Sequence, residues 1–206
     1  MAELCELTAI EARRMIGDKS LSPVDLLESC IARVEAVNPT VNAVTAKAYD
    51  RARAEAKEAE AAVLRGDELG VLHGLPLGVK DLLQTEGILT TFGSLLFKDN
   101  VPDSDESIVA TLRSAGAIVF CKTNTPEFGA GANTTNLVWG ATGNPFDPVR
   151  ICGGSSGGSA VALATNMSPL CTGSDTGGSL RIPAAICGVV SHRSTPGLVP
   201  TEKHGF

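Results

Sequence analysis

The chain has 206 residues, a net charge of −6, and 43% hydrophobic against 19% charged residues, which is the composition of an ordinary globular protein. It contains no apolar run long enough to span a bilayer, and its first residues carry neither the basic nor the apolar region of a secretion signal. The acidic balance and the 4% aromatic content disfavour a nucleic-acid-binding surface. We therefore expect a cytoplasmic protein that binds neither membrane nor nucleic acid.

The cysteines and histidines give no pattern typical of a metal site. The six cysteines are widely spaced, and a chain of this length can bury a core without disulfides, so we expect reduced thiols. Neither a Cys-x-x-Cys nor a His-Glu-x-x-His pattern occurs, and the three histidines are far apart in sequence. The sequence therefore predicts no structural or catalytic metal.

The first third of the chain is predicted to be helical. A capping-box pattern opens a helix over residues 8–17, which ends in glycine. A Ser-Pro start and helical spacing of apolar residues predict a second helix over 22–38, stopped by Asn38-Pro39. The stretch 45–65 is rich in Ala, Glu, Lys and Arg and predicts a long solvated helix.

From residue 71 onward, strand and helix patterns alternate. The stretch 72–81 is predicted to be a strand that runs into a loop at Lys80-Asp81. Further strands are predicted over 117–121 and 169–172, with helices over 105–116 and 159–166. This alternation is typical of an α/β domain with a largely parallel sheet. Residues 123–150 are predicted to form a long irregular connection, and such a connection is usually functional or disordered.

The glycines are concentrated where the function is expected. Ten of the 22 glycines lie between residues 140 and 188, mostly in two segments rich in glycine and serine, 152–159 and 173–181. Glycine allows close backbone approach and unusual φ angles. Exposed backbone N–H groups in such loops can hold an anion or an oxyanion.

Several familiar sites fit these segments poorly. No lysine follows the glycines as in a phosphate-binding loop, and the dinucleotide fingerprint is absent. Residues 154–158 match Gly-x-Ser-x-Gly with Ser156 as nucleophile, but no strand is predicted directly before them and only His192 and His204 follow. A serine nucleophile here would need another base, and a buried lysine with a lowered pKa is the obvious candidate.

The two segments, GGSSGGS at 153–159 and GSDTGGSLRIPAA at 173–185, resemble the signature of the amidase signature family of serine hydrolases. The match extends to GVKD at 78–81 and to residues 123–127 and 143–145, so it covers nearly the whole chain. The resemblance implies an α/β fold with a mixed, largely parallel sheet flanked by helices. It predicts a partial amidase domain over 1–206, with N-terminal helices at 1–70 and a catalytic core at 71–206.

The resemblance also implies that the protein hydrolyses a carboxylic amide to an acid and ammonia or an amine. Ser179 would be the nucleophile and form an acyl-enzyme. Ser155, after a non-proline cis peptide bond, would bridge it to Lys80, a buried neutral lysine that accepts the proton. The oxyanion hole would consist of the backbone N–H groups of Thr176, Gly177, Gly178 and Ser179. The substrate would be a small-molecule amide, with no metal and no cofactor.

Residues around this triad are expected to support it. Asp175 and Arg181 lie on either side of Ser179 in sequence and could pair with each other. Ser156 and Ser159 are expected to be structural, one supporting the loop and the other capping the helix that follows.

The sequence departs from the family in three ways, one of which is Cys152 at a position where a proline is common. Residues 188–197 differ from the usual family run, and family members are considerably longer, so we expect a fold that is incomplete at its C-terminus. One alternative is therefore a truncated, inactive or scaffolding fragment. Another is the glutaminase subunit of a tRNA-dependent amidotransferase, although those subunits tend to carry Gln in the place of Ile182. The sequence leaves a homodimer open.

Overall fold

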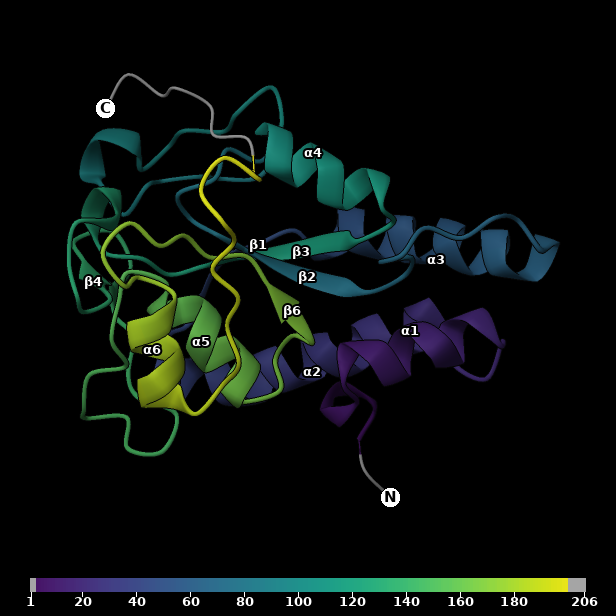
Figure 1. The fold of residues 1–206 in the computed structure, drawn as a ribbon, viewed down its shortest axis with the longest axis horizontal. Coiled ribbons are helices and arrows are strands. Elements are labelled where there is room, and N and C mark those ends of the chain that lie inside the picture. Colours follow the sequence, from purple (N-terminus) through teal and green to yellow (C-terminus); the bar gives the residue numbers. More distant parts are fainter. Residues whose placement is uncertain (1–2, 200–206) are drawn as a thin grey trace.

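A four-stranded sheet organises the part of the chain that the computed structural model describes, residues 3–199 (Figure 1). Its strands, in spatial order, are β1 (Val44–Lys47), β3 (Ile118–Thr123), β2 (Pro76–Lys80) and β6 (Leu170–Cys171). Strand β2 runs parallel to both β3 and β6, whereas β1 pairs with β3 in the antiparallel direction. The predicted mixed, largely parallel sheet is confirmed.

Two N-terminal helices begin where their capping residues predict. Before α1 (Ala9–Gly17), Thr8 Oγ1 accepts from Glu11 N at 3.2 Å, and Thr8 N donates to the Glu11 carboxylate at 3.0 Å. Before α2 (Pro23–Val41), Ser22 Oγ accepts from the backbone N–H of Val24 at 3.0 Å. Both hydroxyls satisfy N–H groups that have no partner inside the helix. A short 3₁₀ turn, η1 (Leu4–Glu6), precedes them.

The end of α2 and the residues after it differ from the prediction. The helix passes Pro39 and ends at Val41, and the next residue, Asn42, has a left-handed φ of 51°. Pro39 has no N–H to donate, so the last turn of α2 lacks one of its hydrogen bonds, and the helix stops two residues later. Asn38 Oδ1 then accepts from the backbone N–H of Ala43 and Val44, which turns the chain directly into β1.

Strand β1 takes residues that the sequence assigned to a helix. Helix α3 (Tyr49–Arg65) begins four residues later than predicted, so the predicted start near residue 45 is wrong. Pairing with β3 determines this conformation, since Val44 lies opposite Thr123 and Lys47 opposite Cys121. Tertiary context of this kind overrides local propensity. Helix α3 packs against α2 and β3, with the Tyr49 and Phe120 rings stacked.

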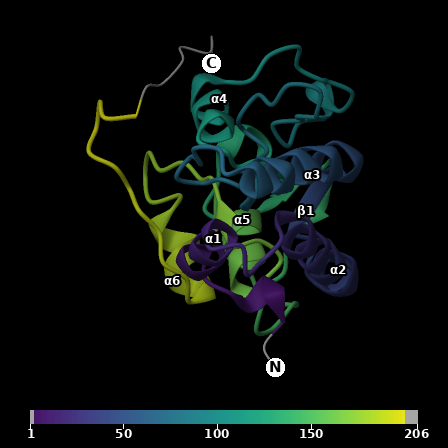
Figure 2. The same cartoon turned by 90° about the vertical axis from the view of Figure 1, so that its right-hand side faces the viewer.

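Helices cover both faces of the sheet (Figures 1 and 2). On one side lie α1, α2, α5 (Gly157–Ala164) and α6 (Arg181–Cys187), and on the other lies α4 (Ser107–Ser114). Val79 and Val119 pack with Val109 of α4, whereas Phe120 belongs to the core formed with α2, α3 and α5. Because side chains alternate along a strand, Val79 and Lys80 face opposite sides of the sheet.

The connection over 123–150 is ordered by short elements and hydrogen bonds. It contains the 3₁₀ turn η3 (Glu127–Gly129) and the strands β4 (Thr135–Asn136) and β5 (Gly140–Ala141), which pair antiparallel. A further 3₁₀ turn, η2 (Leu95–Phe97), lies in the segment between β2 and α4. The Asn124 side chain donates to Gly140 O and Thr142 Oγ1, so it joins the start of the connection to the residues at β5.

All six cysteines are unpaired, and five of them are buried. Within residues 3–199, no helix combines the length and apolarity needed to cross a membrane.

Glycine allows α5 to begin in contact with the neighbouring backbone. A Cβ on Gly158 would lie 2.3 Å from Asn124 N and 2.7 Å from Ala43 O, and neither backbone atom can move aside cheaply. A Cβ on Gly154 would lie 2.9 Å from backbone atoms of Asn133. The first glycine-serine segment is therefore fixed by close packing against residues 124–133.

This packing predicts a large difference between two glycine-to-alanine variants. Gly158→Ala should lower the free energy of unfolding in urea by about 2 kcal/mol, because overpacking outweighs alanine's better helix propensity. Gly177→Ala is the matched control, since nothing lies within 4 Å of its Cβ position. It should change that free energy by less than about 0.5 kcal/mol. Equal effects of the two variants would contradict the packing argument.

Candidate active site

Three parallel strands end at the same edge of the sheet, and this edge carries the candidate site. Strand β2 ends at Lys80, β3 ends at Thr123, and β6 is followed by Thr172. The backbone N–H of Lys80 donates to Thr172 Oγ1 at 2.8 Å, which joins two of these strand ends. In open α/β sheets, ligands bind outside the carboxyl ends of the strands.

Lys80 is fully buried and is surrounded by serine hydroxyls. Its Nζ lies 2.7 Å from Ser155 Oγ, 2.9 Å from Ser156 Oγ and 2.9 Å from Ser174 Oγ. Burial lowers the pKa of Lys80 to about 7, and the negative charge of Asp175 partly opposes this shift. A large fraction of this amine is therefore uncharged near neutral pH.

The hydrogen bonds around Lys80 suit a neutral amine. Ser156 Oγ donates its proton to Ser174 O at 3.3 Å, so towards Lys80 it can only accept. Within residues 3–199, the hydroxyls of Ser155 and Ser174 make no other hydrogen bond. A neutral amine donates twice and accepts once. It can therefore donate to Ser156 and Ser174 and direct its lone pair to Ser155.

The segment that carries Ser155 is held on both sides. The peptide bond between Gly154 and Ser155 is cis, as the resemblance implies, and Ser155 is only 2% exposed. Thr134 Oγ1 donates to Gly153 O at 2.9 Å and accepts from Gly157 N at 3.1 Å. No sequence pattern points to Thr134, because its contacts with Gly153 and Gly157 join segments about twenty residues apart.

The prediction that Ser159 caps the helix after the first glycine-serine segment is wrong. Ser159 lies inside α5, and its hydroxyl bonds to Thr123 Oγ1 at 2.6 Å and to Thr172 O at 2.8 Å. Ser156 occupies the N-cap position without a capping hydrogen bond and contacts Lys80 instead. Ser156 is 2% exposed, which disfavours it as the surface nucleophile of a Gly-x-Ser-x-Gly turn.

The second segment brings Ser179 beside the first through the backbone. Ser156 N donates to Ser179 O at 3.1 Å, and Ser179 is half-buried. In the described part of the chain, the Ser179 hydroxyl itself makes no hydrogen bond with Ser155. The structure thus joins Lys80 and Ser155 directly, and it joins Ser179 through its backbone to Ser156, the residue after Ser155.

Asp175 fixes the backbone around Ser179. Its carboxylate, 1% exposed, forms two bonds of 2.9 Å with the Arg181 guanidinium and lies 3.4 Å from Arg193 Nε. It also accepts from the backbone N–H of Gly178 at 2.8 Å and from that of Leu180 at 3.2 Å. The Arg181 guanidinium, aided by these N–H groups, holds the pKa of Asp175 well below its usual range.

These bonds bear on the predicted oxyanion hole. The N–H of Gly178 is already bound to Asp175, so it is not free for a substrate oxygen in this structure. The N–H groups of Thr176, Gly177 and Ser179 donate to no other group among residues 3–199, which leaves them available.

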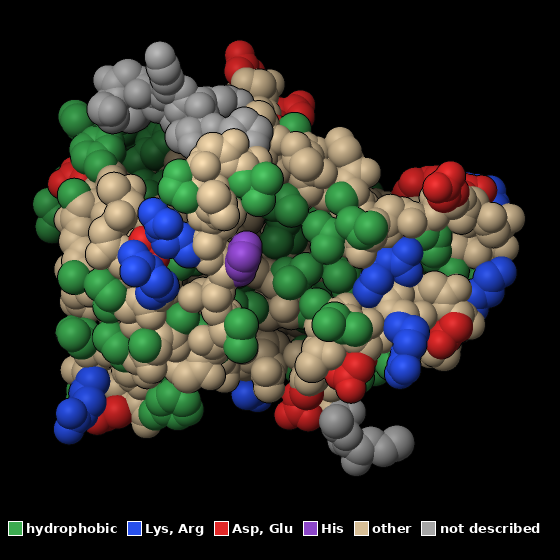
Figure 3. Space-filling view, in the orientation of Figure 1, with side chains coloured by type: hydrophobic (Ala, Val, Ile, Leu, Met, Phe, Trp, Pro, Cys, Tyr) green, Lys and Arg blue, Asp and Glu red, His purple; other side chains and the backbone are tan. Residues whose placement is uncertain are grey.

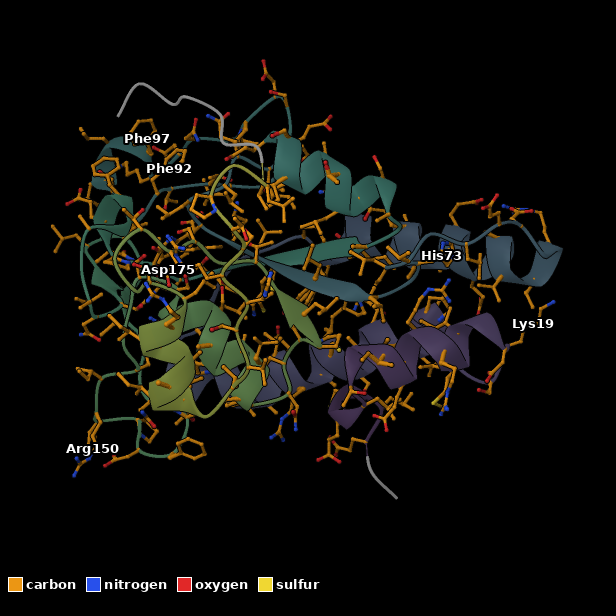
Figure 4. All side chains as sticks on the ribbon, in the orientation of Figure 1. Lys19, His73, Phe92, Phe97, Arg150 and Asp175 are labelled. Carbon is orange, nitrogen blue, oxygen red and sulfur yellow. The ribbon has the colours of Figure 1, made fainter. Side chains whose placement is uncertain are left out.

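The surroundings of the site combine a charged cluster and a cavity. Figure 4 shows Asp175 in the midst of the loops above α6, well away from Arg150 at the outer edge. A cavity of about 390 Å³ adjoins it, lined by Ser174, Asp175, His192 and Arg193 among others. Figure 3 shows basic side chains gathered on this face above α6. Over residues 3–199, no group of three or more His, Cys, Asp or Glu side chains could hold a metal ion.

Comparison with known proteins finds one matching family model and several similar curated proteins. A family model described as Amidase matches residues 25–205. A glutamyl-tRNA(Gln) amidotransferase subunit of Picosynechococcus sp. is 44% identical over 181 residues, covering 88% of this chain and 37% of the relative. The corresponding subunit of Alkaliphilus metalliredigens is 41% identical over 194 residues, covering 94% and 40%. The chain thus spans about two-fifths of the length of these curated relatives.

Several solved structures of amidases are also similar to this chain. A bacterial aryl acylamidase described as an amidase signature enzyme is 35% identical, with a TM-score of 0.83 over 87% of this chain and 37% of its own. The peptide amidase of Stenotrophomonas maltophilia is 33% identical, with a TM-score of 0.83 over 88% and 39%.

The burial of Lys80 predicts a pH dependence of stability. The pKa of the Lys80 amine is about 10.5 in the unfolded chain and about 7 in the folded chain. Burying the charged amine therefore lowers the free energy of unfolding most below pH 7, and this penalty decreases as pH rises towards 10.5. Lys80→Met removes this penalty. Its gain in unfolding free energy over wild type should fall by up to about 1.4 kcal/mol per pH unit between these two values.

Urea unfolding at several pH values measures this gain. Lys98→Met, at a lysine whose side chain is 61% exposed, should show no such trend. A gain for Lys80→Met that is independent of pH would mean that Lys80 is not held with a lowered pKa.

Proposed function

The chain belongs to the amidase signature family, and on that premise we propose that it hydrolyses a carboxylic amide through an acyl-enzyme on Ser179. The observation that carries the proposal is the fully buried Lys80 amine, 2.7 Å from the Ser155 hydroxyl and with a pKa near 7. A general base works best when its pKa lies near the operating pH. Lysine therefore takes the part that histidine plays in many serine hydrolases.

In the proposed reaction, Ser179 Oγ bonds to the amide carbonyl carbon. Its proton passes to Ser155, whose own proton passes to the Lys80 amine. When the C–N bond breaks, the proton returns from Lys80 through Ser155 to the leaving nitrogen. Water then attacks the Ser179 ester by the same proton route, which releases the acid and restores the free hydroxyl.

The negative charge that develops on the carbonyl oxygen needs donors. Among residues 3–199, the backbone N–H groups of Thr176, Gly177 and Ser179 have no other acceptor and can act as these donors, and each such donor contributes about 10²- to 10³-fold in rate. In this proposal Gly178 acts differently from the other three. Its N–H anchors the segment to Asp175, and the Arg181 ion pair keeps that carboxylate in place.

The proposed substrate is a small-molecule amide, and the proposed location is the cytoplasm. The six free cysteines suit a reducing compartment. No step in the proposed reaction requires a cofactor, because the proton transfers use side chains of this chain alone.

A second candidate is the glutaminase subunit of a tRNA-dependent amidotransferase. It is favoured by the 44% identity to a glutamyl-tRNA(Gln) amidotransferase subunit. It is disfavoured by Ile182, an apolar side chain in the first turn of α6 beside Gly178, where those subunits tend to carry Gln. Both candidates use the same proposed triad, so they differ in substrate and in partners.

Covalent labelling with a fluorophosphonate tests the nucleophile. The wild-type chain should be labelled on Ser179, at a rate that rises with pH through about 7, because the reactive form requires the free Lys80 amine. Ser179→Ala should abolish labelling, and Ser155→Ala should reduce it at least about 100-fold. The modified residue is identified by mass spectrometry of peptides.

Two outcomes of the labelling experiment would contradict the proposal. Label on Ser156 with Ser179 unmodified would overturn the assignment. A folded wild-type chain that takes no label would favour the inactive or scaffolding fragment.

The choice of substrate separates the two candidate functions. Simple aliphatic or aryl amides should be hydrolysed by the chain alone, at a rate that Ser179→Ala removes. Ammonia release from glutamine that appears only with added amidotransferase subunits would support the glutaminase instead. Ile182→Gln is the informative variant, since an increase in glutamine hydrolysis relative to the other amides would identify residue 182 as a specificity determinant.

A further inference from the structure

A second buried lysine lies on the opposite face of the sheet from Lys80. Lys122 of β3 is fully buried and is in register with Val79 of β2, whose side chain packs beneath α4. Lys80, in register with Thr123, faces the α5 side. The proposed reaction assigns no role to Lys122.

The partners of Lys122 require it to be charged. Its Nζ donates to Leu83 O, to Thr85 Oγ1 at 2.7 Å and to Thr90 Oγ1 at 3.1 Å. The Thr85 hydroxyl donates its own proton to Leu83 O, and the Thr90 hydroxyl donates to Ile88 O, each at 3.0 Å. All three partners are therefore acceptors, and only an ammonium supplies three protons to them.

Asp81, the residue directly after β2, carries a negative charge that compensates the positive charge of Lys122. Thr91 Oγ1 accepts from Trp139 Nε1 at 2.9 Å and from Gly93 N at 3.1 Å, so its proton goes to the Asp81 carboxylate. The other carboxylate oxygen accepts from Thr91 N at 3.0 Å. Both oxygens accept protons, which favours the ionised carboxylate.

We propose that the Lys122 ammonium and the Asp81 carboxylate clamp the loop of residues 81–94 and thereby hold Lys80 in place for the reaction. Lys122 is then a positioning residue: it touches no substrate and acts through the turn that follows the proposed base. The positioning role rests on the proposed function, whereas the clamp itself does not.

The loop connects the clamp to the site within a few residues. Leu83, whose carbonyl oxygen binds Lys122, donates its N–H to Lys80 O at 3.0 Å. Asp81 N donates to Thr123 O at 3.0 Å, at the end of β3. Leu83 also lines the 390 Å³ cavity together with Ser174, the third hydroxyl on Lys80. A shift of this turn would therefore move both the base and the cavity wall.

The electrostatics make the clamp sensitive to pH. Burial lowers the pKa of Lys122 to about 8, and the negative charges of Asp81, Glu106 and Asp105 oppose this shift, with Cys121 beside it on β3. Burial raises the pKa of Asp81, and the Lys122 charge opposes that shift in turn. Above pH 8 the ammonium loses a proton, and one of its three acceptors loses its donor.

Hydrogen exchange of the whole chain tests the clamp directly. Lys122→Met should lose protection of the backbone amides in residues 83–91 by about 10-fold or more after correction for intrinsic exchange, with α2 and α3 unchanged. In wild type the same amides should lose protection above about pH 8, whereas in Lys122→Met their protection should not vary with pH. Lys98→Met, at an exposed lysine, is the matched control.

Two further measurements complete the test. The rate of fluorophosphonate labelling at Ser179 should fall by about 10²-fold in Lys122→Met, because a small displacement of a catalytic group costs this much. Thr90→Val removes one of the three acceptors of Lys122, together with the hydrogen bond to Ile88 O, and should give intermediate exchange and labelling, which keeps the test usable if Lys122→Met fails to fold.

The outcomes separate the two proposals. Unchanged protection of residues 83–91 in both variants would overturn the clamp, even if Ser179 is labelled. Lost protection with unchanged labelling would overturn the positioning role. Lost protection in a chain whose wild type takes no label would support the clamp and contradict the proposed function.

Discussion

The structure depends on burying the Lys80 amine without a carboxylate in contact with it. Among the described residues, no acidic side chain lies within ion-pair distance of Nζ, and its partners are serine hydroxyls from two separate segments. A buried lysine in such surroundings is costly as an ammonium and tolerable as an amine. Much of the local architecture serves this burial: α5 packs its glycines against residues 124–133, and Ser159 ties α5 to the ends of β3 and β6. The close packing excludes water from the amine, and within residues 3–199 its polar partners are these hydroxyls.

The two buried lysines illustrate how the same side chain acquires different charge states. Each has three oxygen partners and no exposed surface. Around Lys122, the hydroxyl protons are already donated to carbonyl groups, so the lysine must supply every proton itself. Around Lys80, only Ser156 has its proton committed in this way among the described residues, and Ser155 remains able to donate. Burial lowers both pKa values, but it is the orientation of the neighbouring hydroxyl protons that suits one lysine to act as a base and the other to hold a loop.

The sequence predicts the parts of the site that lie within short motifs and misses those that depend on register. The helix starts at Thr8 and Ser22, the largely parallel sheet and the pairing of Asp175 with Arg181 follow from local patterns or from resemblance. Strand β1 could not be predicted, because Val44 and Lys47 are extended only through pairing with β3. Thr134 and Ser174 acquire their contacts only when distant segments meet. Lys122 did leave a signal, since a lysine inside the apolar stretch IVFCKT of β3 must either reach the surface or be paired in the interior.

Asp175 links the chemistry proposed for the site to the part of the chain that departs from the family pattern. Four predicted oxyanion donors reduce to three, because the Gly178 N–H is taken by this carboxylate. That bond holds the backbone that carries the remaining N–H groups in one conformation, since Asp175 also binds Leu180 N and the Arg181 guanidinium. Arg193 adds a second cation 3.4 Å from the carboxylate and donates to Asp175 O at 3.3 Å. Arg193 lies within the unusual stretch 188–197, so this stretch does more than pack around the site: it contributes a charge to Asp175, which orders the backbone around Ser179.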